Sequence, residues 1–507
     1  EISTRDWSSD VCSSDLPDSL SAAVAVGRRG AFAMGDYVFW EDPLTAQRQW
    51  YLDPFAFLSH GLGLDNFPAL TPTTLNGSRV AFSHVDGDAF NGYTEVDKTK
   101  TCAEILLQEI FRKYDFPITV SVIQAEIDPA LFGDEKNVRT ARDIFALPNV
   151  EPASHTYSHP MYWDESTTIN IEAYHGRHGY AIKGYRFNAR QEIAGAAEWI
   201  TRTLAPPGKP CKVLLWSGNC RPKAEHLRLA EEAGLYSMNG GDTVYNFAMH
   251  NSVFYVSGLY RDVDGTYQVF APQANENIMT NLWSTPLYGF RNTIDTYRRT
   301  GSPRRLMPID VYYHFYSGEK LASVSALKDV YGWVLTQEAA LVFASDYIRM
   351  VRGFLSARLA GVAPGVYAVE GYGDCLTVRF EPDGKVPDLA RCENVLGYAI
   401  QPEGLFVHLA PGQARAVVSL TLPPGSAQAA PYLERASGWV RDFAASPGGV
   451  RFTFTRHGRG RVVLAGLAPG SAWSVAAAGG SASLTAGPHG RLELDRLPDG
   501  PVEVRRS

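Results

Sequence analysis

Short apolar runs alternate with amphipathic segments from about residue 79 to residue 360, and this alternation constrains the fold more than any other feature. The segments between the runs carry apolar residues at helical spacing. Strands that alternate with helices form parallel sheets joined by crossover helices, so we expect an α/β fold with a barrel or an open sheet. The predicted strands are 79–85, 118–123, 149–154, 212–217, 235–239 and 307–314.

Beyond about residue 360 the sequence becomes rich in Gly, Pro, Ala, Val and Arg, and its short alternating runs are separated by turn residues. This pattern predicts one or two β-sandwich modules. We therefore expect an α/β domain over 17–360 and a β-rich C-terminal region over 361–507. Aromatic runs break the alternation at 243–306, which we interpret as an insertion near the functional face.

Residues 1–16 fit neither region. The sequence starts with Glu rather than Met, and its first residues are polar, with no charged-then-apolar layout of a signal peptide. We interpret 1–16 as a non-native or read-through segment. We also expect that the natural start, with any export signal or upstream domain, lies outside this sequence.

Composition limits the classes of partner. The 507 residues are 45% hydrophobic, which is enough for a large core, and the formal net charge is -7. A chain without a basic field is not expected to bind nucleic acid or anionic lipid. No apolar run is long enough to predict a membrane span.

The groups with catalytic potential follow the ends of predicted strands. Parallel strands place their C-terminal ends on one face of a sheet, so residues far apart in sequence are expected to share one pocket. In chain order these residues are Asp86 and Asp88, His155 and His159, Arg221, Asp242, and His314.

One acid and two histidines predict a metal site. Asp88, His155 and His159 offer three ligands and leave a coordination position for water, as in a catalytic zinc centre, so we expect a divalent metal with Zn²⁺ as the ion. The spacing of four predicts both imidazoles on one side of a helical turn. Asp86 would stay free as a general base. The duller alternatives are a helix cap for the two acids and core or solvated positions for the two histidines.

Five motifs taken together suggest a family. The stretches "HVDGD", "SHTYSH", "CRP", "NGGD" and "VYYHFYS" resemble the motif series of metal-dependent polysaccharide deacetylases with a NodB homology domain, and of their Pel-type branch in particular. The resemblance covers about residues 50–355. It implies a deformed (β/α) barrel of the NodB type, followed by a β-sandwich-like C-terminal region. It also implies de-N-acetylation of an N-acetylhexosamine-containing, Pel-like exopolysaccharide with release of acetate.

The resemblance further implies roles for single residues and a setting for the protein. A periplasmic or extracytoplasmic location, a biofilm polysaccharide as substrate, and exopolysaccharide export and modification proteins as partners would follow from it. The implied roles are Asp88, His155 and His159 as metal ligands, Asp86 as base, His314 as acid, and Arg221 with Asp242 as a pair that orients Asp86.

Two alternatives from other classes stay open. Asp86-Gly87-Asp88 could be the DxD of a nucleotide-sugar glycosyltransferase, although His155, His159 and His314 would then have no role. The chain could also be a carbohydrate-binding or scaffolding protein with an idle site.

The cysteines leave a further alternative open. Cys375 and Cys392 could form a disulfide or remain free thiols.

Overall fold

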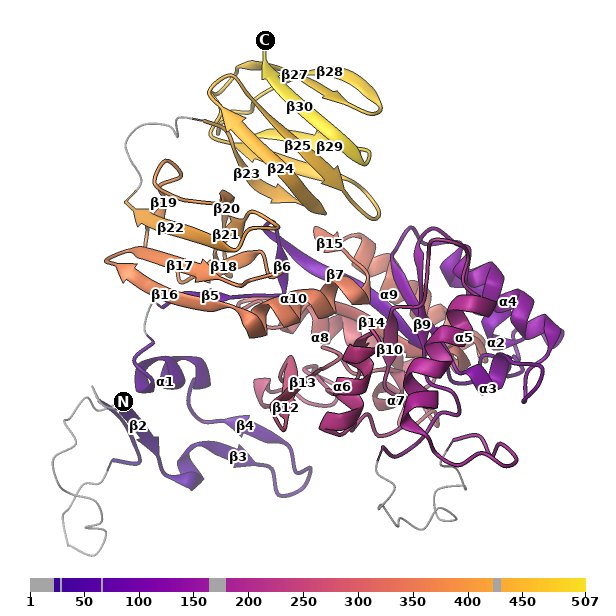
Figure 1. Ribbon diagram of the computed structural model, residues 1–507. Helices are drawn as coiled ribbons and strands as arrows, with labels where there is room; N and C mark the ends of the chain where they lie inside the picture. The colour runs from indigo at the N-terminus through magenta and orange to yellow at the C-terminus, as the bar shows by residue number, and fades with distance from the viewer. Residues whose placement is uncertain (1–21, 28–29, 65–66, 164–178, 423–429) are drawn as a thin grey trace, which may run out of the picture.

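The computed structural model describes residues 22–27, 30–64, 67–163, 179–422 and 430–507. Its main element is a ten-stranded sheet whose strands follow the order β12-β13-β11-β10-β9-β8-β7-β14, with β6 and β15 also paired to β7 (Figure 1). The bounds are β6 (Thr74–Leu75), β7 (Ser78–Asp86), β8 (Ile118–Val122), β9 (Val150–Ser154), β10 (Val213–Leu215), β11 (Tyr236–Met238), β12 (Tyr260–Val263), β13 (Thr266–Val269), β14 (Ile309–His314) and β15 (Ala339–Leu341).

The six predicted strands are all present as β7, β8, β9, β10, β11 and β14, and neighbouring members of this set pair in parallel. The path runs from β12 to β14, so the sheet is a half-barrel in which these two strands form the ends. The α/β architecture followed by a β-rich region is confirmed.

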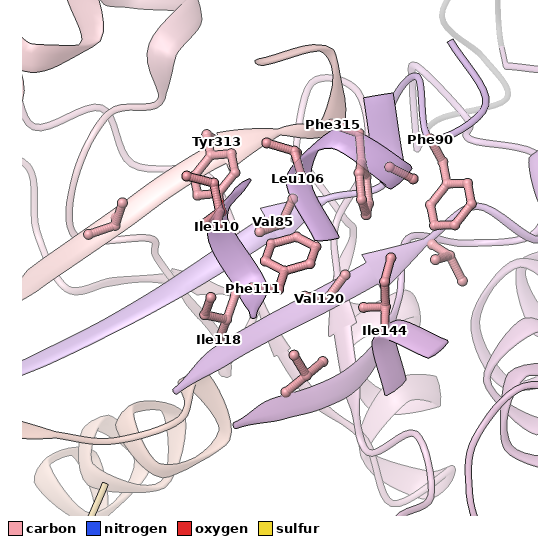
Figure 2. Packing of buried hydrophobic residues seen from close by; sticks show 14 of the residues in the cluster. Val85, Phe90, Leu106, Ile110, Phe111, Ile118, Val120, Ile144, Tyr313 and Phe315 are labelled. Atoms are coloured by element: carbon pink, nitrogen blue, oxygen red, sulfur yellow. The ribbon is translucent and has the colours of Figure 1, made fainter. Parts of the chain in front are cut away.

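The sheet is buried on both faces. On β7, Val80 and Phe82 belong to one core cluster. Ala81 and Val85 belong to another. Figure 2 shows part of the second cluster, where side chains of the sheet meet aromatic and aliphatic side chains such as Phe111. Parallel strands covered on both faces have nearly continuous apolar sequences, which is why the runs could be recognised.

Helices follow the strands as the periodicity predicts. Thr101 begins α2 with a capping box to Glu104, and Asp134 caps α4 through the backbone N–H of Asn137. The helical elements around the sheet are α2 (Cys102–Leu106) with the π-helical turn η2 (Leu107–Phe111), α3 (Gln124–Ile127), α4 (Glu135–Phe145), the π-helical turn η4 (Gln191–Gly195) with α5 (Ala196–Thr203), α6 (Ala224–Glu232), η7 (Phe315–Gly318), α9 (Leu321–Leu335) and α10 (Ala344–Ser356).

Residues 243–306 extend the sheet and add helices beside it. The hairpin β12–β13 lies at its edge, and it pairs in parallel with β11 through Val269 and Met238. The other elements of this segment are η5 (Val253–Tyr255), α7 (Glu276–Met279), η6 (Gly289–Asn292) and α8 (Thr293–Arg299).

Two pairs of β-sheets follow α10 (Figure 1). The first pair has the orders β16-β17-β22-β19 and β20-β21-β18-β5. The second pair has the orders β23-β26-β29 and β24-β25-β30-β27-β28. The bounds are β16 (Arg358–Ala363), β17 (Val366–Glu370), β18 (Thr377–Phe380), β19 (Val386–Pro387), β20 (Val395–Gln401), β21 (Gly404–Leu409), β22 (Arg415–Thr421), β23 (Tyr432–Ala436), β24 (Trp439–Ser446), β25 (Gly449–Thr455), β26 (Arg461–Ala465), β27 (Ala472–Ala477), β28 (Gly480–Thr485), β29 (Leu492–Asp495) and β30 (Gly500–Arg506).

The first pair of β-sheets shares its core with the α/β part. The cluster that holds Val80 and Phe82 of β7 also holds Val369, Val378 and Val407. The strand β5 (Ala69–Leu70), which precedes the main sheet in sequence, pairs with β18. The second pair of sheets has its own cluster around Phe454.

The N-terminal elements lie outside the main sheet (Figure 1). They are β1 (Val24–Gly27), β2 (Gly30–Ala33), η1 (Gly35–Tyr37), β3 (Phe39–Glu41), β4 (Arg48–Trp50) and α1 (Pro54–Gly61). The predicted read-through segment 1–16 lies outside the described residues. Cys375 and Cys392 are free thiols, so the structure has the second of the two cysteine alternatives. Within the described part of the chain, we find no helix with the length and apolar character to cross a bilayer.

Candidate metal centre

The structure brings the three predicted ligands together. Suitable donor atoms of Asp88, His155 and His159 all lie within 4.8 Å of one another. Nε2 of His155 lies 3.2 Å from Oδ2 of Asp88, and Nε2 of His159 lies 3.0 Å from Oδ1. The two imidazoles therefore present the same ring atom to the same carboxylate, on the face where β7 and β9 end.

These three residues fit a divalent cation. The Oδ2 atom of Asp88 is buried and has no hydrogen-bond donor, as expected of an oxygen whose natural partner is an ion. Burial raises the pKa of Asp88, but the two neighbouring imidazoles, that of His159 first and then that of His155, outweigh burial and hold the pKa well below its usual range. Two imidazole nitrogens and one carboxylate oxygen are the donors that catalytic zinc takes, with one position left for water.

The residue between the two acids, Gly87, has no room for a side chain. A Cβ atom at this position would lie 2.9 Å from the backbone nitrogen of Ile123 and 3.1 Å from Cβ of His155. The loop after β7 therefore lies against the loops after β8 and β9. This close approach brings Asp88 to the histidines.

The backbone between the two histidines differs from the predicted helical turn. The segment from His155 to His159 is a loop rather than a helical turn. Thr156 and His159 have positive φ angles of 76° and 60°, so the chain reverses tightly between the two ligands. The helical interpretation was wrong because four-residue spacing is also compatible with a loop of this kind.

Asp86 lies beside the cluster and is almost fully buried. Its carboxylate accepts hydrogen bonds from Nδ2 of Asn239, at 3.1 and 3.0 Å, and from the hydroxyl of Tyr312, at 2.8 Å. Nδ1 of His155 is 3.6 Å from Oδ1 of Asp86. Asp86 is therefore held firmly at the edge of the metal site without being one of the three clustered ligands.

His314 faces Asp86 from the end of β14. Its Nε2 atom lies 3.7 Å from Oδ2 of Asp86, and its Nδ1 atom lies 3.0 Å from a carboxylate oxygen of Glu276. Burial lowers the pKa of His314, but the charge and hydrogen bond of Glu276, with smaller contributions from Asp88 and Asp86, raise it to about 9. This imidazole is protonated at neutral pH.

Arg221 and Asp242 make none of the hydrogen bonds to Asp86 that the described residues show. Both side chains are exposed, in the loops that follow β10 and β11. Partial burial raises the pKa of Asp242, and the charge of Arg221 offsets part of that rise. Among the described residues, the hydrogen bonds to Asp86 come from Asn239 and Tyr312 instead.

The sequence did not predict the hydrogen bonds that three residues make at the site. Asn239 is the last residue of the predicted strand 235–239, and Tyr312 stands two residues before His314, so strand-end placement could have suggested both. Glu276 lies in α7, within the segment interpreted as an insertion, and its sequence context gives no signal that it reaches His314.

The solved structures found by comparison include distant neighbours. No family model matches this sequence, and no curated protein matches it. A 4-alpha-glucanotransferase from Thermococcus litoralis is 12% identical, with 53% of this chain and 39% of that chain covered and a TM-score of 0.32. This chain thus spans about two fifths of the glucanotransferase. An alpha-amylase from Malbranchea cinnamomea is 11% identical over 86% and 97% of the chains, with a TM-score of 0.23. A GH30 endoxylanase from Clostridium papyrosolvens C71 is 10% identical over 84% and 96%, with a TM-score of 0.20.

These comparisons contradict the family resemblance. No deacetylase family model matches, and the neighbours just described are named as a glucanotransferase, an amylase and an endoxylanase. The assignment to NodB-type polysaccharide deacetylases, the hydrolysis of an N-acetyl amide, and the Pel-like biofilm substrate were therefore wrong. Because their TM-scores are at most 0.32, the neighbours transfer no activity of their own to this chain.

Proposed function

We propose that this chain is a metal-dependent hydrolase whose centre is formed by Asp88, His155 and His159. The observation that carries the proposal is the convergence of these three side chains from two separate strand ends, with a fourth group, Asp86, held beside them. A divalent cation, for which Zn²⁺ suits the donors, would supply Lewis acidity and lower the pKa of a water molecule.

Asp86 is suited to accept the proton of the attacking water. Asn239 and Tyr312 both donate hydrogen bonds to its carboxylate, which fixes the orientation of the base. A base that is fixed before the reaction loses little entropy in the transition state.

His314 is suited to protonate the leaving group. The pKa near 9 means that the imidazole carries the required proton at neutral pH, and Nε2 faces the side of Asp86. Glu276 holds Nδ1 and therefore leaves Nε2 as the atom from which the proton is given.

We further propose a carbohydrate as the substrate. Tyr316 lies parallel to His314 with ring centroids 4.7 Å apart, and Trp283 packs edge-on against Tyr316 at 4.9 Å. Aromatic side chains beside an acid-base pair are suited to contact sugar rings. Trp163 and Trp216, by contrast, are buried core residues.

The glycosyltransferase alternative is less favoured. A DxD site would use both acids on a metal-diphosphate complex, whereas Asp86 is already bonded to Asn239 and Tyr312, and only Asp88 joins the histidine cluster.

The test is a panel of p-nitrophenyl substrates that offers an ester, a phosphate and several glycosides, assayed after chelation and after return of Zn²⁺. We expect hydrolysis of at least one class to be lost on chelation, to return with the metal, and to be absent in His159→Ala. Hydrolysis that survives both chelation and His159→Ala would contradict the proposal, and the substrate that responds identifies the bond.

A further inference from the structure

Two buried glutamates each hold one of the loops that carry the metal ligands. Glu126, at the end of α3, accepts hydrogen bonds from the backbone N–H groups of Ala89 and Phe90, at 3.3 and 2.9 Å. These are the two residues that follow Asp88. Glu126 is only 3% exposed, and its carboxylate also accepts a hydrogen bond from the hydroxyl of Tyr180.

Glu192 repeats this arrangement on the histidine loop. It accepts hydrogen bonds from the backbone N–H groups of Tyr157 and Ser158, at 3.0 and 2.9 Å, and from the Ser158 hydroxyl. Both residues lie between His155 and His159. Glu192 is fully buried, and the hydroxyl of Tyr185 donates to it at 2.7 Å.

Both tyrosines come from one short stretch, residues 179–188, which we call the strap. The backbone N–H of Tyr180 donates to the carbonyl of Ser158 at 2.7 Å. At Gly179, with a φ of +78°, a Cβ atom would lie 2.2 Å from the Ser158 carbonyl oxygen. The strap therefore lies directly against the histidine loop while it reaches both glutamates.

The loops are also tied to each other. The backbone N–H groups of Gln124 and Ala125 donate to the carbonyls of Thr156 and Tyr157, at 3.0 and 2.9 Å. Buried carboxylates are retained in proteins where several donors satisfy them. Here the donors include the backbone beside each group of ligands, so the glutamates fix where Asp88, His155 and His159 can lie.

We propose that the strap sets the affinity of the metal centre, with Tyr180 and Tyr185 acting through Glu126 and Glu192 as positioning residues. This inference rests on the proposed function only for the presence of a metal at Asp88, His155 and His159. None of the four residues contacts the cation or the reacting atoms in this proposal. Residues that orient ligands typically change metal affinity by about 10- to 100-fold when they are mutated.

The experiment uses the full chain and measures the dissociation constant for Zn²⁺ by competition with a chromophoric chelator. Tyr185→Phe and Tyr180→Phe remove one hydroxyl each and keep the rings. We expect each to weaken Zn²⁺ binding about tenfold, and to alter the visible absorption of the Co²⁺-substituted protein. Glu192→Gln is a second variant with the same expected direction.

Matched controls separate positioning from general stability. Tyr372→Phe removes a buried hydroxyl that donates to the Ala410 carbonyl at 2.8 Å, away from the site. Glu151→Gln changes a half-buried glutamate that accepts hydrogen bonds from the hydroxyls of Thr119 and Ser345. Both controls are expected to keep the parent affinity for Zn²⁺ and the parent Co²⁺ spectrum, whatever their effect on the thermal midpoint.

The outcomes distinguish the two proposals. Unchanged Zn²⁺ affinity and Co²⁺ spectrum in Tyr185→Phe, Tyr180→Phe and Glu192→Gln would contradict the proposal that the strap sets metal affinity. The hydrolase proposal would still stand. An equal loss of affinity in the controls would also contradict the proposal about the strap. A parent protein that binds no Zn²⁺ would overturn both proposals. If the parent protein has no hydrolytic activity but the strap variants bind Zn²⁺ more weakly, the proposal about the strap is supported and the hydrolase proposal is not.

Discussion

At the scale of single residues, the two neighbouring acids have different surroundings. Asp88 has a buried oxygen that accepts no hydrogen bond from the described residues and has two imidazole nitrogens nearby. Asp86 instead accepts hydrogen bonds from Asn239 and Tyr312. The two carboxylates are therefore suited to different partners, because environment decides whether a carboxylate is available to a cation or to a proton.

Asp86→Asn tests this division. We expect the variant to bind Zn²⁺ with the parent affinity, because its ligands are untouched, and to lose about 10²- to 10⁴-fold in kcat because the general base is gone. Metal titration and steady-state kinetics on the responsive substrate give the two readouts. Loss of Zn²⁺ binding in Asp86→Asn would show that Asp86 is itself a ligand.

Glu276→Gln tests the proton on His314. The negative charge of Glu276 opposes the effect of burial and raises the pKa of His314 to about 9, so activity that needs the imidazolium should fall as pH rises through about 9. The substitution removes this charge, so the effect of burial dominates, the pKa of His314 falls, and the alkaline limb of kcat/KM should move to lower pH. Glu151→Gln is the control, and an unmoved limb in Glu276→Gln would remove His314 from the acid role.

At the scale of elements, the strands could be predicted and the loops could not. The strands were recognisable because burial on both faces makes them continuous apolar runs. Their ends located Asp88, His155 and His159, which the structure brings together. Loop conformation depends on local contacts that no periodicity records. The tight reversal at Thr156 and the approach at Gly87 are examples, and both decide the ligand geometry.

Gly87→Ala tests the close approach of the loops. The added Cβ meets the backbone of Ile123 and the side chain of His155, so we expect a loss of about 1–3 kcal/mol in unfolding free energy together with weaker Zn²⁺ binding. Denaturant unfolding and metal titration measure the two effects. Gly332→Ala is a matched control in α9 where a Cβ meets nothing within 4 Å, and it should stabilise by about 0.5–1 kcal/mol. A Gly87→Ala variant that behaves like Gly332→Ala would refute the packing argument.

At the scale of the whole molecule, the β-rich region is joined to the α/β part by more than chain connectivity. Asn76 donates to the carbonyl of Gly438 at 2.9 Å, and Glu338 forms ion pairs with Arg435 and Arg461. The first pair of sheets also shares the core under β7. Sequence composition indicated where β-rich structure begins, but not that the two parts would pack as one.

Two truncations test the shared core. A chain that ends at residue 357 lacks Val369, Val378 and Val407 and exposes the apolar residues that share a core cluster with them, so we expect aggregation or loss of cooperative unfolding. A chain that ends at residue 422 keeps the first pair of sheets and should remain folded with a lower thermal midpoint. Circular dichroism and size-exclusion chromatography distinguish these results, and a well-folded 1–357 fragment would contradict the shared core.

Strand β7 runs for nine residues, and its last residue is the candidate base. Just before its first residue, Asn76 and Gly77 contact Gly438 and Ala436 of the C-terminal region. Strand β7 thus connects the C-terminal region to Asp86. An inactive variant without the C-terminal region would consequently not show whether this region contacts substrate. Loss of the contacts at the start of β7 is enough to displace the carboxylate of Asp86 at its end.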